Sequence, residues 1–213
     1  MKHCWQILKP GFHSSFQDTG RFSWAHLGIP VSGALDIPAA QWANRLLGNA
    51  ENSTVIEITL TGLSFKSFCD CSIAVTGAVF ECHVNGKAAD NQQTINLKAG
   101  DTFNMVKLQT GLRAHMAVAG GFEIETILGS TSTLVMAQLG GYKGRALQTN
   151  DFIKLNDPKQ VPVRPVANWK RPKSQNTHII RALPGPEYDL FDHYSQKSVW
   201  QQAFLPQRLA QKV

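Results

Sequence analysis

The sequence predicts a mainly β domain, a barrel or a sandwich with one embedded short helix. Short apolar or alternating segments follow one another at nearly even spacing, with turn residues between them, which is typical of such folds. One of these turns, Asn85-Gly86, is a dipeptide that two-residue β-hairpins favour. The stretch from residue 36 to residue 48 instead combines helical spacing with signals for a start and a stop.

The expected strands are separated by residues that favour turns. Besides the hairpin turn, Ala99-Gly100-Asp101 and Thr110-Gly111 are predicted as turns, because Gly and Asp adopt the backbone angles that turns require. The expected strands are Cys4–Leu8, Val55–Leu60, Leu63–Phe68, Ser72–Thr76, Val79–Val84, Thr94–Leu97, Phe103–Leu108 and His115–Ala119.

The expected helix begins after Asp36 and ends before Gly48. Asp36 can cap its N-terminus, and Pro38 suits its first turn. Gly48 can end it, because glycine adopts the left-handed conformation of a helix C-terminus without strain. The face that packs on the sheet is predicted from an apolar stripe, Trp42, Ala43, Leu46 and Leu47.

We divide the chain into three parts. Residues 1–156 are expected to form a β-barrel domain that includes the helix and the loop before it. Residues 157–177 are rich in Pro and basic residues and are expected to form an extended connector. Residues 178–213 are expected to begin a second β-rich domain, with a strand at 178–183, and to continue as a divergent tail. From Ser195 this tail is expected to form a short amphipathic helix or to stay loose.

The net charge lies entirely in the last quarter of the chain. Residues 1–158 contain 12 Lys and Arg and 12 Asp and Glu, whereas residues 159–213 contain 9 and 3, which gives the whole net charge of +6. A solvated basic tail is the simplest interpretation. Aromatic residues are not interleaved with the basic ones, so no nucleic-acid partner is expected. An acidic protein partner remains open.

The cysteines and the hydropathy pattern indicate a cytoplasmic protein. Four cysteines are too few and too unevenly placed for a disulfide scaffold, so reduced thiols are expected. No signal peptide is visible at the N-terminus, and no apolar run is long enough to cross a bilayer. We therefore expect no membrane association.

A glycine-rich loop before the helix carries polar side chains that suit a binding site. Asp18 and Arg21 lie three positions apart, where a carboxylate and a guanidinium can together bind a planar carboxylate, carbamate or amide group. The same pair is equally consistent with a salt bridge that fixes the loop. Ser32 and Gly33 can offer a hydroxyl and backbone N–H groups to an anion, or can form the turn ahead of the helix cap.

Three further places hold candidate site residues. Asn44 is an amide on an otherwise apolar helix, which suits either a ligand contact or a satisfied position in the core. Thr76 and Gly77 stand where a strand is expected to end, a place where the backbone bends or is closely approached. Arg145 belongs to the glycine-rich segment Leu139–Arg145, which can receive a carboxylate or a phosphate.

The sequence has no evident nucleophile, phosphate-binding loop or metal site. The patterns GxSxG, GxxxxGK[ST] and GxGxxG are absent, so this chain is expected to bind no cofactor with its own residues. His26 and His115 are minority candidates for a general base, because partly buried structural rings are commoner. Cys69-x-Cys71 with Cys82-His83 does not match the spacing of a structural zinc site, and no metal is expected.

A series of motifs carries a family resemblance between Gln17 and Leu147. They are QDTGR at Gln17–Arg21, GIPVSGALD at Gly28–Asp36, ANRLLGN at Ala43–Asn49, IEITLTG at Ile56–Gly62, VTGA at Val75–Ala78, LRAHMAVAGG at Leu112–Gly121, LGSTST at Leu128–Thr133 and LGGYKGRAL at Leu139–Leu147. In this order they resemble the KipA family, the C subunits of bacterial 5-oxoprolinase. Its members are also labelled biotin-dependent carboxyltransferase or allophanate hydrolase subunit 2.

The resemblance implies a fold and a function. It implies a cyclophilin-like β-barrel that works with a B subunit of related fold and a TIM-barrel-like A subunit, together hydrolysing 5-oxoproline to glutamate with ATP bound by the partner subunits. One alternative is a biotin-dependent carboxyltransferase component that moves a carboxyl group from carboxybiotin to urea or a related amide. Another is a regulatory protein that binds a kinase inhibitor resembling the B subunit, or an inactive truncated paralogue.

The shared demand of these reactions is to hold an amide or ureido group and to meet charge that develops on its oxygen. We expect Arg21 and Arg145 to hold an anionic group, Asn44 and Ser32 to hydrogen-bond the amide, and Asp18 to orient Arg21 or to accept a proton. Gly33, Thr76 and Gly77 are expected to contribute to substrate binding.

The resemblance is expected to end near His193. The stretch around Pro184-Gly185-Pro186 resembles the opening of the family's second β-rich half, which is then expected to be largely missing. Self-association is a further expectation, because a half-domain would expose apolar surface that its other half normally covers.

Overall fold

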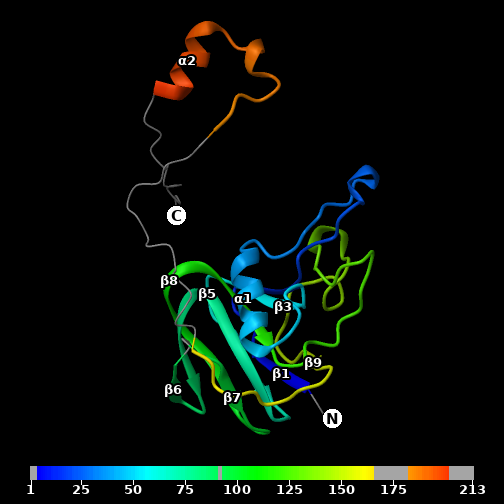
Figure 1. Ribbon diagram of the computed structural model, residues 1–213, viewed down its shortest axis with the longest axis vertical. Helices are drawn as coiled ribbons and strands as arrows, with labels where there is room; N and C mark the ends of the chain where they lie inside the picture. Colours follow the sequence, from blue (N-terminus) through cyan, green and yellow to red (C-terminus); the bar gives the residue numbers. More distant parts are fainter. Residues whose placement is uncertain (1–3, 91–92, 166–181, 202–213) are drawn as a thin grey trace. The chain divides into compact units, whose positions relative to one another are not determined.

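The computed structural model describes residues 4–90, 93–165 and 182–201, and the chain divides into two compact units, Met1–Lys170 and Arg171–Val213. The described part of the first unit is a curled antiparallel sheet with one α-helix on its outer face (Figure 1). The expectation of a mainly β, barrel-like domain with one embedded helix is confirmed.

Nine strands form the sheet in the order β2-β3-β8-β4-β1-β9, and β5 pairs with β6, β7 and β8. Three short 3-10 helices also occur among the described residues: η1 (Ala25–Leu27), η2 (Val135–Ala137) and η3 (Tyr188–Leu190). The strands are β1 (Cys4–Lys9), β2 (His13–Gln17), β3 (Val55–Thr59), β4 (Ser64–Ser67), β5 (Cys71–Val84), β6 (Lys87–Ala89), β7 (Ile95–Leu97), β8 (Thr102–Val118) and β9 (Phe152–Lys154).

The two long strands β5 and β8 correct the predicted segmentation. Each replaces two of the expected strands, so Thr76 and Gly77 lie inside β5 and Thr110-Gly111 lies inside β8 rather than in a turn. Their pairing shifts register between Gly77 and Val79, as at a β-bulge, which lets a long strand bend without ending. Gly111 adopts φ +85° there, and an added Cβ would come within 2.9 Å of the Ala78 Cα.

Helix α1 (Ile37–Leu47) forms where the sequence predicts it. The Asp36 carboxylate accepts a hydrogen bond of 3.1 Å from the Ala39 N–H, and Gly48 ends the helix in the left-handed conformation. The predicted apolar stripe packs on the outer side of the sheet. Ala43, Leu46 and Leu47 are buried there, and Trp42 packs against the same cluster but is only partly buried. The second core cluster lies at this contact and consists of Ala34, Ala40, Ala43, Leu46, Leu47, Val55, Ala74, Ala117 and Ala119.

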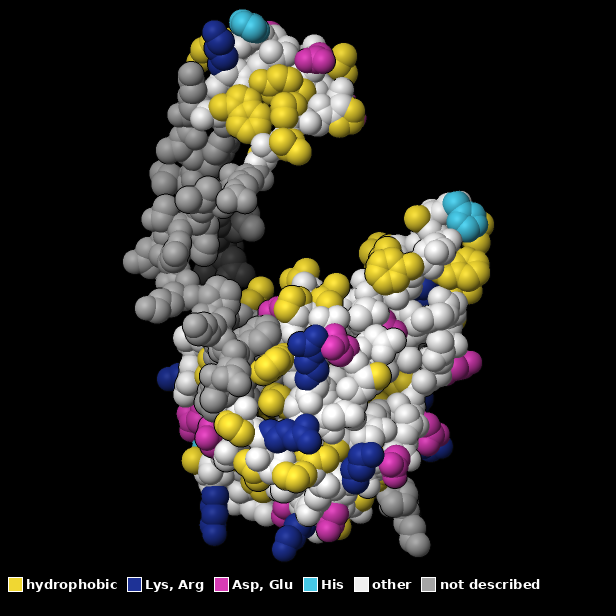
Figure 2. Space-filling model, viewed as in Figure 1, with side chains coloured by type: hydrophobic (Ala, Val, Ile, Leu, Met, Phe, Trp, Pro, Cys, Tyr) yellow, Lys and Arg dark blue, Asp and Glu magenta, His cyan; other side chains and the backbone are white. Residues whose placement is uncertain are grey.

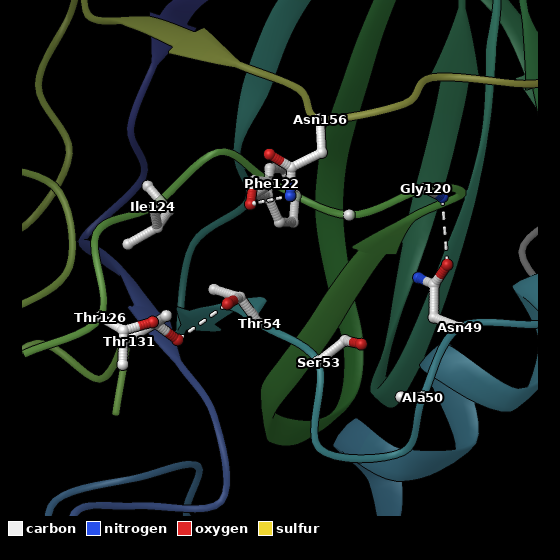
Figure 3. A pocket seen from close by; sticks show the side chains of 11 residues that line it. Asn49, Ala50, Ser53, Thr54, Gly120, Phe122, Ile124, Thr126, Thr131 and Asn156 are labelled. Carbon is white, nitrogen blue, oxygen red and sulfur yellow. Dashed lines mark hydrogen bonds between the residues drawn. The ribbon is translucent and has the colours of Figure 1, made fainter. Parts of the chain in front are cut away.

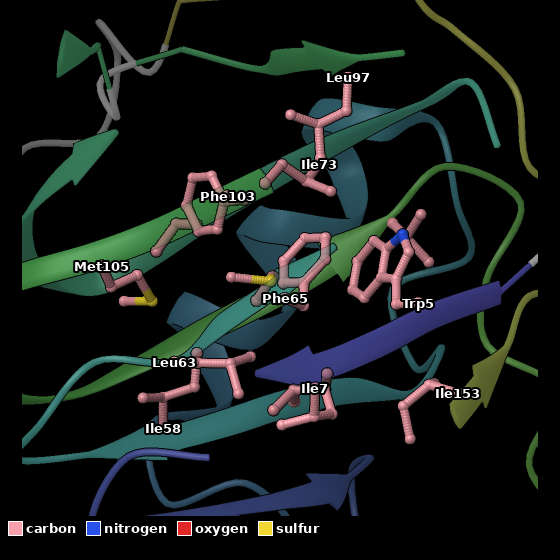
Figure 4. Packing of buried hydrophobic residues seen from close by; sticks show 14 of the residues in the cluster. Trp5, Ile7, Ile58, Leu63, Phe65, Ile73, Leu97, Phe103, Met105 and Ile153 are labelled. Carbon is pink, nitrogen blue, oxygen red and sulfur yellow. The ribbon is translucent and has the colours of Figure 1, made fainter. Parts of the chain in front are cut away.

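The main core lies on the inner, concave side of the curled sheet (Figure 4). The Trp5 ring stacks on Phe65 with centroids 3.9 Å apart, and Phe122 meets Trp5 edge-on at 5.4 Å. These side chains come from β1, β4 and the segment after β8, so the aromatic contacts join strands that are distant in the sequence. They hold the sheet in its curled shape.

The first part of the predicted connector packs on the first unit. The Val161 N–H donates to Ser72 Oγ, and the Arg164 N–H donates to Thr94 Oγ1. Gln160 Nε2 donates to the Leu97 carbonyl oxygen. Residues 166–177 of the predicted connector lie outside the described residues.

The described part of the second unit, residues 182–201, contains η3 and a second helix, α2 (His193–Gln201). Tyr188 and Trp200 contact each other, and Tyr188 Oη accepts a hydrogen bond from Trp200 Nε1. Of the strand expected at 178–183, Ala182 and Leu183 are not in a strand, and the rest lies outside the described residues. The predicted tail helix corresponds to α2 as far as Gln201. None of the described helices is long and apolar enough to cross a membrane.

Loss of the helix cap tests the local assignment of α1. We expect Asp36→Ala to lower the free energy of unfolding by about 1 kcal/mol, because the Ala39 N–H loses its acceptor. Asp36→Asn keeps an acceptor oxygen and is the matched control, which is expected to stay close to the wild type. Urea unfolding followed by tryptophan fluorescence measures both. Equal stability of Asp36→Ala and the wild type would contradict the cap.

Candidate functional site

The residues Ile127–Thr133, here called the serine-threonine loop, are held in place by Asp18 from the predicted glycine-rich loop. Asp18 Oδ1 accepts hydrogen bonds from Ser130 Oγ at 2.7 Å and from Ser132 Oγ at 2.5 Å. Its Oδ2 accepts from the Thr131 backbone N–H at 2.7 Å and from Thr131 Oγ1 at 3.2 Å. One carboxylate therefore fixes three consecutive residues of this loop.

The ionised form of Asp18 is favoured by these contacts. Burial raises the pKa of the Asp18 carboxyl, but the hydrogen bonds from Ser132, Ser130, the Thr131 N–H and the Gly20 N–H outweigh burial and hold the pKa below its ordinary value. A carboxylate stabilised in this way is a strong acceptor and a weak base. Its geometry suits the positioning of the loop better than the removal of a proton.

The Arg21 side chain binds the backbone of the same loop. The fully buried guanidinium donates from Nε to the Ile127 carbonyl at 3.1 Å and from Nη2 to the Ser132 carbonyl at 2.9 Å. Its Nη1 has no hydrogen-bond partner among the described residues. The predicted Asp18–Arg21 pair is not formed, because each side chain contacts the serine-threonine loop instead of the other.

Asn44 supports the turn that follows α1. Its Nδ2 donates to the Ser53 carbonyl at 2.8 Å, and its Oδ1 accepts from Asn49 Nδ2 at 3.1 Å. Asn49 in turn donates to the Val118 carbonyl and accepts from the Gly120 N–H. The buried Asn44 amide is therefore hydrogen-bonded within the core, which is one of its two predicted roles. Its contacts fix the positions of Asn49 and Ser53.

A hollow of about 380 Å³ lies where these supported segments meet (Figure 3). Its wall comes from the turn after α1, from the Gly-Gly turn after β8 and the segment that follows it, from the serine-threonine loop and from the segment after β9. The lining residues are Asn49, Ala50, Ser53, Thr54, Gly120, Gly121, Phe122, Ile124, Thr126, Thr131 and Asn156. Three of the motifs that carry the family resemblance contribute to this wall.

The predicted catalytic residues stand behind this wall rather than in it. Asp18 contacts Thr131, Asn44 contacts Asn49 and Ser53, and Arg21 binds carbonyls beside Thr126 and Thr131. None of the three is a lining residue. The structure thus brings the three predicted catalytic residues around one hollow, with their polar groups engaged by the protein except for Arg21 Nη1. Their predicted catalytic roles stay predictions.

The other predicted residues lie in three separate places. Ser32, with φ +58°, and Gly33 pack against Gly20, where an added Cβ on Gly33 would come within 3.0 Å of the Gly20 backbone. The Thr76 hydroxyl donates to the Ala39 carbonyl at 2.6 Å and ties α1 to the sheet. Gly77, with φ +84°, avoids a contact of 2.6 Å between a Cβ and the Arg113 carbonyl. These contacts are structural.

Arg145 is paired with a carboxylate outside the hollow. Its two terminal nitrogens donate to the two Asp151 oxygens at 2.8 and 2.7 Å, and Asp151 raises the pKa of Arg145 through this hydrogen bonding. Its glycine-rich segment packs behind the serine-threonine loop, because the Gly141 N–H donates to the Thr131 carbonyl and an added Cβ on Gly140 would clash with the Ser132 carbonyl. The guanidinium group that we expect to hold an anion thus already pairs with Asp151, and its role in substrate binding stays a prediction.

A second polar cluster lies under the N-terminus of α1. The buried Glu57 carboxylate accepts from Arg113 at 2.6 Å, from His115 Nε2 at 3.1 Å and from the Leu35 N–H at 2.8 Å. Because a carboxylate only accepts, Nε2 carries hydrogen, and Nδ1 of the fully buried His115 has no partner among the described residues. His115 is thus placed in a charged network rather than at the hollow.

Burial raises the pKa of Glu57, but the hydrogen bond from His115 and the contacts with the Leu35 N–H and Arg113 outweigh burial and lower the pKa to about 2. Cys69, Cys71 and Cys82 are buried and form no disulfide bond among the described residues. Within residues 4–90, 93–165 and 182–201, no three His, Cys, Asp or Glu side chains are grouped where they could hold a metal ion.

Comparison with known proteins identifies the family. The family model of the carboxyltransferase domain, subdomain A and B, matches residues 27–210. The chain belongs to this carboxyltransferase domain family. It is 36% identical to the C subunit of 5-oxoprolinase from Escherichia coli (strain K12) over 195 residues, which are 92% of this chain and 62% of that protein. It is 37% identical to urea amidolyase of Saccharomyces cerevisiae over 151 residues, 70% of this chain and 8% of that protein.

The solved structure of K. lactis urea amidolyase resembles this carboxyltransferase domain with a TM-score of 0.70 and 36% sequence identity, over 73% of this chain and 9% of that one. The chain spans less than two thirds of the length of the bacterial relative. The family match continues to residue 210, so the expectation that the resemblance ends near His193 is wrong.

Sequence reasoning missed the wall of the hollow in this carboxyltransferase domain. Asn49 and Thr131 lie within motifs that carry the resemblance, and the motif LGSTST is the signal that could have pointed to Thr131. Thr54 and Asn156 lie outside those motifs. A single neutral side chain forms no recognisable sequence motif. These residues can be recognised as part of a site only because the fold brings them together.

Removal of the Asp18 carboxylate tests its structural role. We expect Asp18→Ala to lower the free energy of unfolding by about 3–5 kcal/mol, because several polar groups lose their acceptor and each one left unsatisfied costs about 1–3 kcal/mol. Asp157→Ala, which removes an exposed carboxylate, is the control and is expected to change stability by less than about 0.5 kcal/mol. Similar losses in the two variants, measured by urea unfolding, would contradict the assignment.

Glu57 predicts a dependence of stability on acid. Its folded pKa lies below its ordinary value, so its contribution is fully present above the ordinary value of 4.5 and is lost as the pH falls through about 2. The slope of the unfolding free energy against pH reports how many more protons the unfolded state binds. We expect Glu57→Gln to reduce this slope in this pH window by the equivalent of up to about one proton. The part due to Asp18 and Asp151, whose pKa values are also lowered, should remain. Parallel curves for variant and wild type would refute the assignment.

Proposed function

We propose that this chain contributes to an ATP-dependent 5-oxoprolinase, in which it helps to hydrolyse 5-oxoproline to glutamate together with A-type and B-type subunits. The similarity to the C subunit of a bacterial 5-oxoprolinase, which extends over most of this chain, supports the proposal. The substrate is a lactam, so the protein must hold a neutral cyclic amide while its C–N bond is broken.

The observation that carries the proposal is the neutral polar wall of the hollow. It offers hydroxyl, amide and backbone groups, and none of its lining residues has an ionisable side chain. Such a wall can hydrogen-bond an amide without the desolvation cost of a buried charge. The contribution of this chain is then to bind and orient the lactam amide, with Asp18, Arg21 and Asn44 as positioning residues behind the wall.

The chemistry of ATP is assigned to the partner subunits in this proposal. The sequence contains no GxxxxGK[ST] phosphate-binding loop. A partner contact is supported by the loop between Arg21 and Pro30, which projects from the first unit and carries hydrophobic side chains at its tip (Figure 2). Phe22 and Leu27 in this loop are 60% and 61% exposed. A B-type subunit is the partner that we propose for this apolar surface.

A second candidate function is the transfer of a carboxyl group from carboxybiotin to urea or a related amide. The similarity to urea amidolyases supports it. The chemistry of the hollow fits both groups, since urea and the ureido ring of biotin are neutral and carry N–H and C=O groups like a lactam. Thr54, Asn49 and Asn156 would hold such a group, and biotin would supply the carboxyl group.

Reconstitution decides between the two functions. The full chain is combined with bacterial A-type and B-type subunits, 5-oxoproline and ATP, and glutamate is measured. We expect ATP-dependent release of glutamate that requires all three proteins. The control omits this chain and keeps its two partners.

Release of glutamate that is the same with and without the chain would overturn the 5-oxoprolinase proposal. Carboxylation of urea, assayed with a biotin carboxylase and biotin carrier, would in that case establish the second function. Failure of both reactions would overturn both.

A further inference from the structure

The direction of the hydrogen bonds in the wall of the hollow can be worked out from its anchor. Asp18 is ionised and accepts only, so the Thr131 hydroxyl, 3.2 Å from Oδ2, donates its one hydrogen to Asp18. Thr131 Oγ1 and Thr54 Oγ1 are 2.7 Å apart. Because the Thr131 hydrogen is already used, the Thr54 hydroxyl must be the donor in this second contact.

The consequence is that Thr54 has no hydrogen left for a ligand. A hydroxyl carries one hydrogen and two lone pairs, and the Thr54 hydrogen is used in the contact with Thr131, which Figure 3 marks with a dashed line. Its oxygen can therefore only accept a hydrogen bond from a molecule in the hollow. Through the two hydrogen bonds from Thr131 to Asp18 and from Thr54 to Thr131, the charge of Asp18 determines that the Thr54 hydroxyl acts as an acceptor.

The two asparagines of the wall each offer an acceptor oxygen. The Asn49 orientation is fixed because its Oδ1 accepts from the Gly120 N–H, while both of its Nδ2 hydrogens go to Asn44 and Val118. Asn156 Nδ2 donates to the Phe122 carbonyl at 2.9 Å, which assigns its other amide atom as oxygen. Asn156 Oδ1 accepts no hydrogen bond from the described residues, so a lone pair is available there as well. The second hydrogen of Asn156 Nδ2 is not used within the described residues, so Asn156 can also donate.

Three backbone N–H groups of the wall are also engaged. The Gly120 N–H donates to Asn49, the Gly121 N–H to the Val118 carbonyl and the Thr131 N–H to Asp18. The acceptor sites that remain are on Thr54, Asn49 and Asn156, whereas Ser53 and Thr126 have hydroxyls that can donate or accept. Thr54 and Asn49 can therefore only accept with their side chains, whereas Ser53, Thr126 and Asn156 can also donate.

We propose that the hollow selects ligands by their N–H groups, and that Thr54 is a specificity-determining residue that accepts from the N–H of a neutral lactam or ureido group. This inference rests on the proposed function for the class of substrate, but it concerns binding by this chain alone. It predicts that an N-alkylated ligand of the same ring binds more weakly, because it has no N–H to donate to the Thr54 oxygen.

The test compares two small ligands that differ in one N–H. The full 213-residue chain is titrated with 2-pyrrolidinone and with N-methyl-2-pyrrolidinone, and amide chemical shifts are followed by NMR. Ligands of this size are expected to bind in the millimolar range. We expect 2-pyrrolidinone to shift the signals of Thr54, Thr131 and Gly121 and to bind about three- to ten-fold more tightly than its N-methyl analogue.

Two variants locate the selectivity. Thr54→Val has nearly the same shape without the acceptor and is expected to lose the preference, whereas the matched control Thr54→Ser keeps the hydroxyl and the preference. Thr131→Val keeps the backbone N–H to Asp18 but removes the acceptor of the Thr54 hydrogen. That hydrogen is then free to turn into the hollow, so the N-methyl analogue is expected to gain affinity.

Equal affinities of the two ligands in the wild type, a preference that survives in Thr54→Val, or the absence of binding by 2-pyrrolidinone would each overturn this inference. The outcome is separable from that of the proposed function. Selective binding without glutamate release in the reconstituted system would support the polarity of the hollow and overturn the 5-oxoprolinase proposal. Glutamate release without selective binding would support the 5-oxoprolinase proposal and overturn the inference about Thr54.

Discussion

The carboxylate of Asp18 is the contact on which the site of this protein depends. It accepts hydrogen bonds from three consecutive residues of the serine-threonine loop and so satisfies their donors. Arg21 completes the hold by binding two carbonyls of the same loop. Since Thr131 belongs to this loop and also lines the hollow, the anchor fixes both the position of the wall and the direction of its hydrogen bonds.

The curled sheet and helix α1 bring the other parts of the wall to the same place. The apolar face of the helix, made of Ala and Leu residues, packs on the outer side of the sheet. The buried Asn44 amide orders the turn that follows the helix. The Gly-Gly turn after β8 allows a close approach to the segment after β9, because an added Cβ on Gly120 would clash with the Asp157 carbonyl. Segments that are distant in the sequence therefore form one hollow through backbone contacts as much as through side chains.

Local signals made part of this structure predictable. The cap at Asp36, the stop at Gly48 and the Asn85-Gly86 hairpin each depend on a few adjacent residues, and the structure confirms them. The continuity of β5 and β8 was not predictable, because a glycine in a bulge looks the same in sequence as a glycine in a turn. For the site, charge pointed to Asp18, Arg21 and Arg145, whose charged groups bind other parts of the protein, although Arg21 Nη1 has no partner among the described residues. The neutral Thr54 and Asn156 gave no signal before the fold brought them together.

The central claim is that Asp18 holds the serine-threonine loop in a fixed shape. Amide hydrogen exchange of Thr131 tests it most directly, because this N–H donates to Asp18 Oδ2 at 2.7 Å and lies in a loop rather than in a strand. The account predicts strong protection of the Thr131 amide in the wild type and its loss in Asp18→Asn, with the protection of Trp5 in β1 unchanged. Rapid exchange of Thr131 in the wild type, or protection that survives in Asp18→Asn, would contradict it.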